Sequence, residues 1–146
     1  MFMTGESMGV LGSGAHGVVR MAQHVATGEM VAIKVLAIGS RGPLAQVAKE
    51  LAAQGSIHHP HVVELRETLC DLDRHHVFMV MELCRGGELF DRIAECGSLD
   101  QECAQRYLYQ LSSALAACHA ANIYHRDLKP ENVLLSADGD VKIAGN

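Results

Sequence analysis

Residues 125–132 read His-Arg-Asp-Leu-Lys-Pro-Glu-Asn, the most informative stretch of the sequence. Within six residues it supplies a carboxylate at Asp127, a cation at Lys129 and an amide oxygen at Asn132. Transfer of a phosphoryl group to a hydroxyl needs a carboxylate to orient the nucleophile, a cation near the transferring group, and an oxygen ligand for a metal ion. A charged loop that only caps a helix is the alternative, but it has no need of all three types. The stretch therefore predicts a phosphoryl-transfer site.

A glycine-rich stretch stands near the start of the chain, Gly12-Ser13-Gly14-Ala15-His16-Gly17. In a dinucleotide-binding fold such glycines open a helix, whose N-terminus then meets a pyrophosphate. Here the β-branched Val18 and Val19 follow, which are poor helix starters. A strand–loop–strand lid over phosphates fits better, and a flexible turn with no ligand is the third interpretation of the spacing by itself.

Lys34 lies in the apolar stretch Val31-Ala32-Ile33-Lys34, at hairpin distance from the glycines. A lysine in such a stretch is usually an exposed charge at a strand edge. If it is buried it must be paired, because an isolated ammonium group is costly to desolvate. Glu50 is the candidate partner, and the pair would place a fixed cation where phosphate oxygens bind.

The hydrophobic pattern predicts a strand-rich part, a hinge at Arg85-Gly86-Gly87 and then a helical part. Strands are expected over residues 18–25, 30–38, 62–69 and 77–83, with a turn at 27–28, and a closing hairpin over residues 133–143.

Two helices are expected in addition. The first covers residues 44–52, and the second runs from about 100 to 121 and begins at a capping box formed by Ser98 and Gln101. The second helix is predicted to bury one stripe of small and apolar residues, which consists of Ala104, Leu108, Leu111, Leu115 and Cys118.

Composition limits the classes of partner. The formal net charge of −5 argues against a nucleic acid or an anionic membrane surface as the main partner. The five cysteines form no C-x-x-C pair, which is typical of reduced thiols in a cytoplasmic or nuclear protein. No stretch is apolar enough to predict a membrane span, and the N-terminus does not have the pattern of a signal peptide.

With these motifs in this order, the chain resembles the eukaryotic Ser/Thr protein kinases over nearly all of its length. Residues 125–132 agree with the catalytic-loop signature of that family at every specified position. The sequence of residues 80–93 is most similar to the calcium- and calmodulin-dependent kinase group, and within it to the calcium-dependent protein kinases. The resemblance implies an α+β fold with a small strand-rich N-lobe that has one main helix (residues 1–83), then a hinge and the first part of a helical C-lobe (residues 84–146).

The resemblance also implies roles for individual residues. Asp127 would be the catalytic base, Lys129 its phosphate partner and Asn132 a ligand of Mg²⁺, while Lys34 would pair with Glu50. The implied substrates are ATP and a protein Ser/Thr hydroxyl, with basic residues upstream of it. The implied ATP-binding residues are Leu11, Gly12, Gly14, Gly17, Val19, Ala32, Lys34, Met81, Glu82, Cys84, Glu88, Glu131, Asn132 and Leu134.

The sequence departs from the family pattern at two places. His16 stands where the family usually has an aromatic residue at the tip of the glycine loop. After Ala144 the family places Asp-Phe-Gly, whose Asp holds Mg²⁺, whereas here Gly145 and Asn146 follow and the printed chain ends.

Two hypotheses follow from the second departure. The chain is either an incomplete part of an ATP-dependent Ser/Thr kinase, or a truncated non-catalytic module that binds nucleotide or a kinase partner. In both cases we expect the 146-residue chain to transfer phosphate weakly or not at all.

Overall fold

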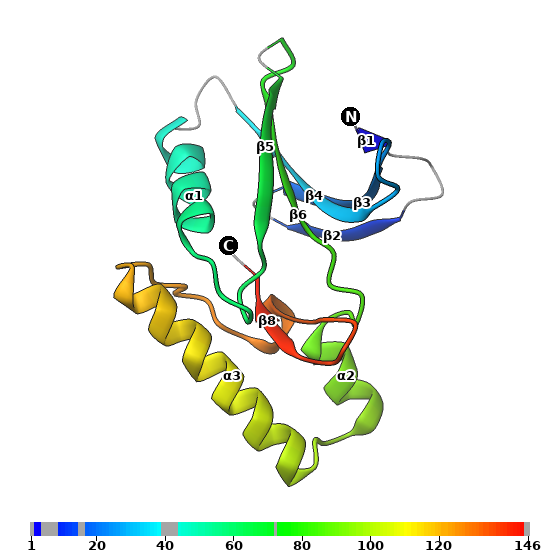
Figure 1. Ribbon diagram of the computed structural model, residues 1–146, viewed down its shortest axis with the longest axis vertical. Coiled ribbons are helices and arrows are strands. Elements are labelled where there is room, and N and C mark those ends of the chain that lie inside the picture. The colour runs from blue at the N-terminus through cyan, green and yellow to red at the C-terminus, as the bar shows by residue number, and fades with distance from the viewer. Residues whose placement is uncertain (1, 4–8, 15–16, 39–43, 72, 145–146) are drawn as a thin grey trace. The chain divides into compact units, whose positions relative to one another are not determined.

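The structure is a computed structural model that describes residues 2–3, 9–14, 17–38, 44–71 and 73–144 (Figure 1). The chain forms two compact units. One consists of Met1–Gly55 with Leu65–Leu83, and we call it the strand-rich unit; the other consists of Ser56–Glu64 with Cys84–Asn146, and we call it the helix-rich unit. The described residues contain antiparallel sheets and three α-helices, which confirms the predicted α+β class.

The strand-rich unit is built on one antiparallel sheet. Its strands follow the order β1-β3-β4-β6-β5, with β2 paired to β3. The predicted turn at Thr27-Gly28 is confirmed, because Gly28 has φ 71° and its amide donates to the His24 carbonyl at 2.8 Å. The elements of this unit are β1 (Phe2–Met3), β2 (Val10–Gly14), β3 (Gly17–His24), β4 (Met30–Ala37), α1 (Leu44–Ser56), β5 (Leu65–Asp71) and β6 (His76–Glu82).

The two faces of this sheet carry different clusters of apolar side chains. Residues that face each other across antiparallel strands share a face. On one face Leu36, Val77 and Met79 form a buried cluster, and Leu51 of α1 packs against it. The other face carries a second cluster, made of Ala22, Val31, Ile33 and Val80 with Phe2, Val35 and Phe78 beside it.

The helix-rich unit packs two helices against a short hairpin. The hydrophobic contacts of α3 with β8 include Ala114, Cys118 and Ile143, and those of α2 with β7 include Leu89 and Val133. The predicted hairpin is confirmed, with Leu135 opposite Val141. The elements of this unit are α2 (Leu89–Cys96), α3 (Gln101–Ala120), the short 3₁₀ helix η1 (Pro130–Asn132), β7 (Val133–Leu135) and β8 (Val141–Ile143).

Helix α3 confirms the predicted helix but corrects two of its details. The N-cap is Asp100, whose carboxylate accepts from the Cys103 amide at 2.7 Å, so the Ser98–Gln101 capping box was wrong. The predicted stripe holds at its C-terminal end, where Cys118 is buried and Leu111 and Leu115 pack against the core. It is wrong at Ala104 and Leu108, which are exposed (Leu108 to 67%), whereas Tyr107 and Gln110 are buried. The first half of the stripe was wrong because Tyr107 and Gln110, which the stripe left out, occupy core positions.

Residues 56–64 correct a further prediction. The strand expected from residue 62 begins at Leu65 instead, and Val62 forms a parallel bridge with Ile143 of β8. The Val63 amide donates to the Ile143 carbonyl and the Ile143 amide donates to the His61 carbonyl, both at 2.9 Å. The segment is therefore built into the helix-rich unit, although α1 and β5 flank it in the sequence.

His59 anchors this segment. Its Nε2 lies 3.1 Å from Ser113 Oγ, and its Nδ1 accepts from the His61 amide at 3.1 Å. The acceptor role requires an unprotonated Nδ1, so the imidazole is neutral with its proton on Nε2. Burial lowers the pKa of His59 below 6.5, and the neighbouring His61 and Lys142 lower it further.

We expect this histidine to make stability depend on pH. Its folded-state pKa is depressed, so the unfolded chain binds the proton more readily than the folded chain. The free energy of unfolding should therefore fall as the pH drops below about 6.5, until the folded-state pKa is passed. Urea unfolding of wild type and His59→Gln, from neutral pH down to about pH 5, measures this. The variant should show a shallower decline, and identical slopes would contradict the assignment.

Candidate active site

Four of the predicted ATP-site residues share one face of the sheet in the strand-rich unit. Val19 of β3 lies opposite Lys34 of β4, and Ala32 lies opposite Met81 of β6. Because residues opposite each other point to the same face, and because Ala32 and Lys34 are two apart on one strand, all four side chains lie together. Lys34 is buried, with 9% of its surface exposed, so it is not the exposed edge charge that was the simpler alternative.

Glu50 lies on α1, but its side chain is outside the described residues. The predicted Lys34–Glu50 pair therefore stays a prediction.

The glycine-rich stretch joins two strands. Gly12 and Gly14 lie in β2, Gly17 begins β3, and Gly14 pairs with Gly17 across the hairpin. This arrangement excludes the dinucleotide-binding alternative, in which the glycines would open a helix. Leu11 is exposed at a register shift between Val10 and Gly12. The tip of the loop, Ala15 and His16, lies outside the described residues.

The segment after β6 carries the next group of predicted residues. Glu82 is the last residue of β6 and lies opposite Val31. Cys84 is half-buried and is the first residue of the helix-rich unit after the junction. Gly86 then pairs with β7, since its amide donates to the Leu135 carbonyl at 2.9 Å. A Cβ on Gly86 would lie 2.6 Å from that of Leu135, so this close approach requires glycine.

The catalytic-loop residues gather around Asp127 in the helix-rich unit. Lys129 Nζ lies 2.9 Å from Asp127 Oδ2. Asn132 Nδ2 donates to the Asp127 carbonyl at 2.7 Å and to Oδ2 at 3.2 Å. The local sequence explains these contacts. Pro130 is the first residue of η1, a position that proline favours, and η1 brings Asn132 back to Asp127. The three residue types that phosphoryl transfer requires are thus assembled around one carboxylate.

Charge keeps this carboxylate ionised. The hydrogen bond from Lys129 lowers the pKa of Asp127, with a smaller contribution from Asn132. The same hydrogen bond raises the pKa of Lys129. Asp127 is therefore an anion at neutral pH, able to accept a hydrogen bond from a hydroxyl, and Lys129 is a cation beside it.

His125 and Arg126 shape the loop, and sequence reasoning assigned no separate role to either. His125 Nε2 donates to the Ala144 carbonyl at 2.8 Å, and its Nδ1 accepts from the Asp127 amide at 3.3 Å. These two roles fix the neutral tautomer with the proton on Nε2. Arg126 has φ 65°, a left-handed conformation that non-glycine residues rarely adopt and that concentrates at functional sites.

Acidic side chains lie at the start of α2. Glu88 is the N-cap residue and forms an antiparallel bridge with Leu134 of β7. Burial raises the pKa of Glu88, and the negative charges of Asp91 and Glu131 raise it further. The structure therefore brings the predicted residues Glu88 and Glu131 together and adds Asp91, which sequence reasoning did not single out.

The residues that the structure describes do not by themselves complete a Mg²⁺ site. Mg²⁺ needs octahedral oxygen ligands and is normally held through carboxylates and phosphates. Asn132 engages Asp127 with its amide nitrogen, which leaves its oxygen as the one predicted ligand. Position 145, where the family has a carboxylate, is a glycine outside the described residues. Among the residues that the structure describes, no group of three His, Cys, Asp or Glu side chains could hold a metal ion.

No helix in the described part of the chain has the length and apolarity needed to cross a bilayer.

Comparison with known proteins gives consistent matches. The family model described as protein kinase domain matches residues 6–145. Putative CBL-interacting protein kinase 27 of Oryza sativa subsp. japonica is 46% identical over 138 residues, which cover 92% of this chain and 34% of that protein. CBL-interacting serine/threonine-protein kinase 16 of Arabidopsis thaliana is 41% identical over 138 residues, which cover 92% of this chain and 29% of that protein. The chain thus spans about a third of the length of these curated relatives.

Proposed function

Because the chain belongs to the protein kinase domain family, we propose that it is part of an ATP-dependent Ser/Thr protein kinase. The observation that carries the proposal is the contact set around Asp127, which Lys129 and Asn132 both bond. This arrangement presents an ionised carboxylate to an incoming hydroxyl and a cation to the transferring group. The name of the Arabidopsis relative says that it is a serine/threonine-protein kinase, which supports the same reaction class.

In this proposal the two units carry separate groups of predicted residues. The strand-rich unit contributes the glycine hairpin and the sheet face of Lys34, with Val19, Ala32 and Met81 against the adenine. The helix-rich unit contributes Asp127 as the base that orients the Ser/Thr hydroxyl, and Lys129 as the cation that neutralises the transferring phosphoryl group. When bound, Mg²⁺ would supply charge neutralisation at the phosphates, but the described residues do not complete its ligand set.

We further propose that the protein substrate carries a basic residue upstream of the acceptor. Support comes from Glu88, whose pKa is raised partly by Asp91 and Glu131. A guanidinium group placed among these carboxylates would relieve their mutual repulsion and could form a bidentate pair.

The named relatives also indicate to which branch of the kinase family the chain is most similar. Both relatives named above are CBL-interacting kinases, not the calcium-dependent protein kinases that residues 80–93 had suggested. We therefore place the chain nearer the CBL-interacting branch. By the names of these relatives, we infer that the protein to which this chain belongs binds a CBL protein.

One observation favours the second candidate, a non-catalytic module that binds nucleotide. It is Gly145 at the position of the metal carboxylate, since nucleotide contacts from Lys34 and the glycine hairpin do not depend on that residue. The two candidates differ in phosphoryl transfer but share the nucleotide site.

The nucleotide site is tested by titrating the chain with a fluorescent ATP analogue. Lys34→Met should weaken binding about tenfold or more, because a buried cation that contacts phosphates is lost. Arg20→Met is the matched control: it also removes a cation from the sheet, but Arg20 lies opposite Ile33 and hence on the other face. Equal affinities for the two variants would remove Lys34 from the site. In a parallel assay with a Ser peptide we expect little or no transfer under either candidate, and robust transfer that disappears in Asp127→Ala would exclude the non-catalytic module.

A further inference from the structure

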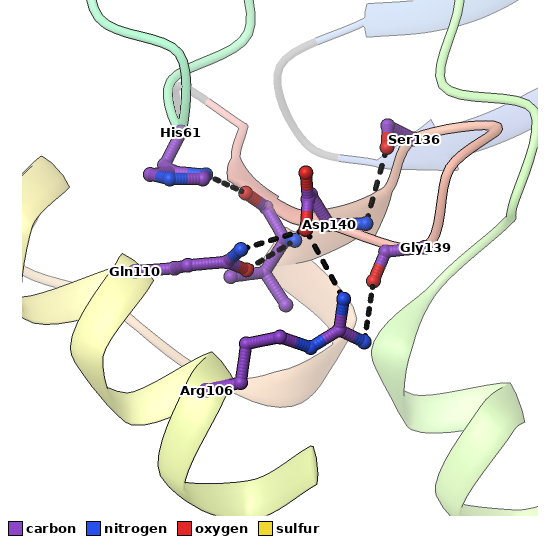
Figure 2. A network of polar contacts seen from close by, with 7 residues as sticks. His61, Arg106, Gln110, Ser136, Gly139 and Asp140 are labelled. Atoms are coloured by element: carbon purple, nitrogen blue, oxygen red, sulfur yellow. Dashed lines mark hydrogen bonds and ion pairs between the residues drawn. The ribbon is translucent and has the colours of Figure 1, made fainter.

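Gln110 of α3 is buried, with 7% of its surface exposed, and both ends of its amide are bonded. Its Oε1 accepts from the Val141 amide at 3.0 Å, and its Nε2 donates to Asp140 Oδ1 at 2.7 Å (Figure 2). Figure 2 shows that Gln110 and Arg106 reach from the same helix toward the turn before β8. Gln110 is thus the buried side chain of a polar network whose other polar side chains are partly or fully exposed.

Side chains of Gln110 and His61 bond the backbone groups on the edge of β8 that does not face β7. In a two-stranded hairpin one edge of each strand lies without a partner strand, and buried backbone groups there must find other partners. The Val141 amide bonds Gln110, and the Val141 carbonyl accepts from His61 Nδ1 at 3.0 Å. Two residues later, Ile143 exchanges backbone bonds with His61 and Val63. Val141 and Ile143 are almost fully buried, so water cannot replace these partners.

The end of β8 in turn holds the catalytic loop. The Ala144 amide donates to the Asn132 carbonyl at 3.0 Å, and the Ala144 carbonyl accepts from His125 Nε2 at 2.8 Å. His125 and Asn132 both bond Asp127, in addition to the ion pair that Asp127 forms with Lys129. A continuous set of hydrogen bonds therefore runs from Gln110 through β8 to Asp127, entirely within the helix-rich unit.

We propose that Gln110 is a positioning residue, which sets the geometry of Asp127 by fixing β8 against α3. The role in catalysis rests on the proposed kinase function, whereas the effect on the loop does not. The amide is suited to this role because it must accept from Val141 and donate to Asp140 at once, and no other neutral side chain of that length does both.

The neighbouring contacts supply the control. Arg106 Nη1 also bonds Asp140 Oδ1, at 3.3 Å, and Arg106 Nη2 bonds the Gly139 carbonyl at 3.4 Å. Arg106 is exposed and bonds the turn and not the β8 backbone, so Arg106→Gln loosens the turn without removing a partner of Val141. An effect of Gln110 on the loop that Arg106→Gln does not reproduce would be specific to β8.

The test is nitrogen-15 NMR on the 146-residue chain without nucleotide. In wild type the His125 imidazole should show one fixed tautomer, with the proton on Nε2, and the Asn132 side-chain amide should be protected from exchange. Gln110→Leu should mix the His125 tautomers and speed exchange of the Val141 and Asn132 amides about tenfold. Gln110→Glu, which keeps the acceptor for Val141, should fall between Gln110→Leu and wild type.

The set of variants also allows for a Gln110 variant that is too unstable to fold. Gln110→Glu serves as the informative variant should Gln110→Leu fail to fold. If Arg106→Gln and the Gln110 variants change the His125 and Asn132 signals equally, or if none of them does, Gln110 is only a structural residue and the proposal is wrong. Because no catalytic or nucleotide signal is measured, failure of the kinase assay and failure of this inference are distinguishable.

Discussion

Gly17→Ala should destabilise the strand-rich unit strongly. Gly17 has φ +122°, a conformation that residues with a side chain rarely adopt. A Cβ at this position would lie 2.2 Å from the Val35 carbonyl oxygen, an atom of the paired backbone of β4 that cannot rotate away. We expect a loss of about 2–4 kcal/mol, from roughly 1–3 kcal/mol of backbone strain together with the cost of separating β3 from β4.

The matched control is another glycine of the same motif. A Cβ on Gly12 would meet nothing within 4 Å. Gly12→Ala should therefore change the free energy of unfolding by less than about 0.5 kcal/mol. Urea denaturation of both variants measures the difference, and the fluorescent ATP analogue measures function. If Gly12 serves close approach to phosphates, Gly12→Ala should weaken nucleotide binding while stability is kept. Equal stabilities for the two variants would contradict the packing argument.

These glycines show what a motif does and does not reveal. The G-x-G-x-x-G spacing does not distinguish Gly12 from Gly17 as positions that require glycine. The valines that follow it correctly predict a strand instead of a helix. The sequence could not show that β4 approaches Gly17 closely, because that contact is set by the pairing of β3 with β4. Local pattern predicts the hairpin, whereas the need for glycine at one of its positions is a property of the sheet.

In the candidate site, too, local contacts could be predicted from the sequence and tertiary contacts could not. The contacts of Asp127 with Lys129 and Asn132 are predictable because all three residues lie within one short loop. The shared face of Lys34 and Ala32 follows from the two-residue period of a strand. Gln110 could not be identified in this way, because its partners Asp140 and Val141 lie 30 and 31 residues further along the chain. A stripe of small and apolar residues leaves a glutamine out, and it includes Leu108, which the structure shows to be exposed.

The pairing of residues 61–63 with β8 was missed for a related reason. The predicted strand over residues 62–69 assigned this region to a single element. In the structure the part before Leu65 pairs with β8, a strand some 80 residues later in the chain. Such pairing depends on tertiary contacts that override local β-propensity.

Gly145→Asp should make nucleotide binding depend on Mg²⁺. In wild type we expect the affinity for the ATP analogue to differ by less than about twofold between Mg²⁺ and EDTA, because one amide oxygen is a poor ligand set for Mg²⁺. A carboxylate at position 145 would supply the charge that the Asn132 amide cannot. Binding in Mg²⁺ should then become at least about tenfold tighter than in EDTA, which corresponds to about 1.4 kcal/mol.

Gly145→Asn is the matched control for this prediction, because it adds a side chain of the same size and shape without the charge. If charge is what the site lacks, Gly145→Asn should behave as wild type in both media. A similar gain in the Asn and Asp variants would instead show that the side chain acts by restricting the backbone after β8, as expected when glycine is replaced. A wild-type chain that already binds the analogue much more tightly in Mg²⁺ would contradict the donor-set argument. It would place other oxygen ligands near Asn132, and the kinase interpretation would then no longer require a carboxylate at position 145.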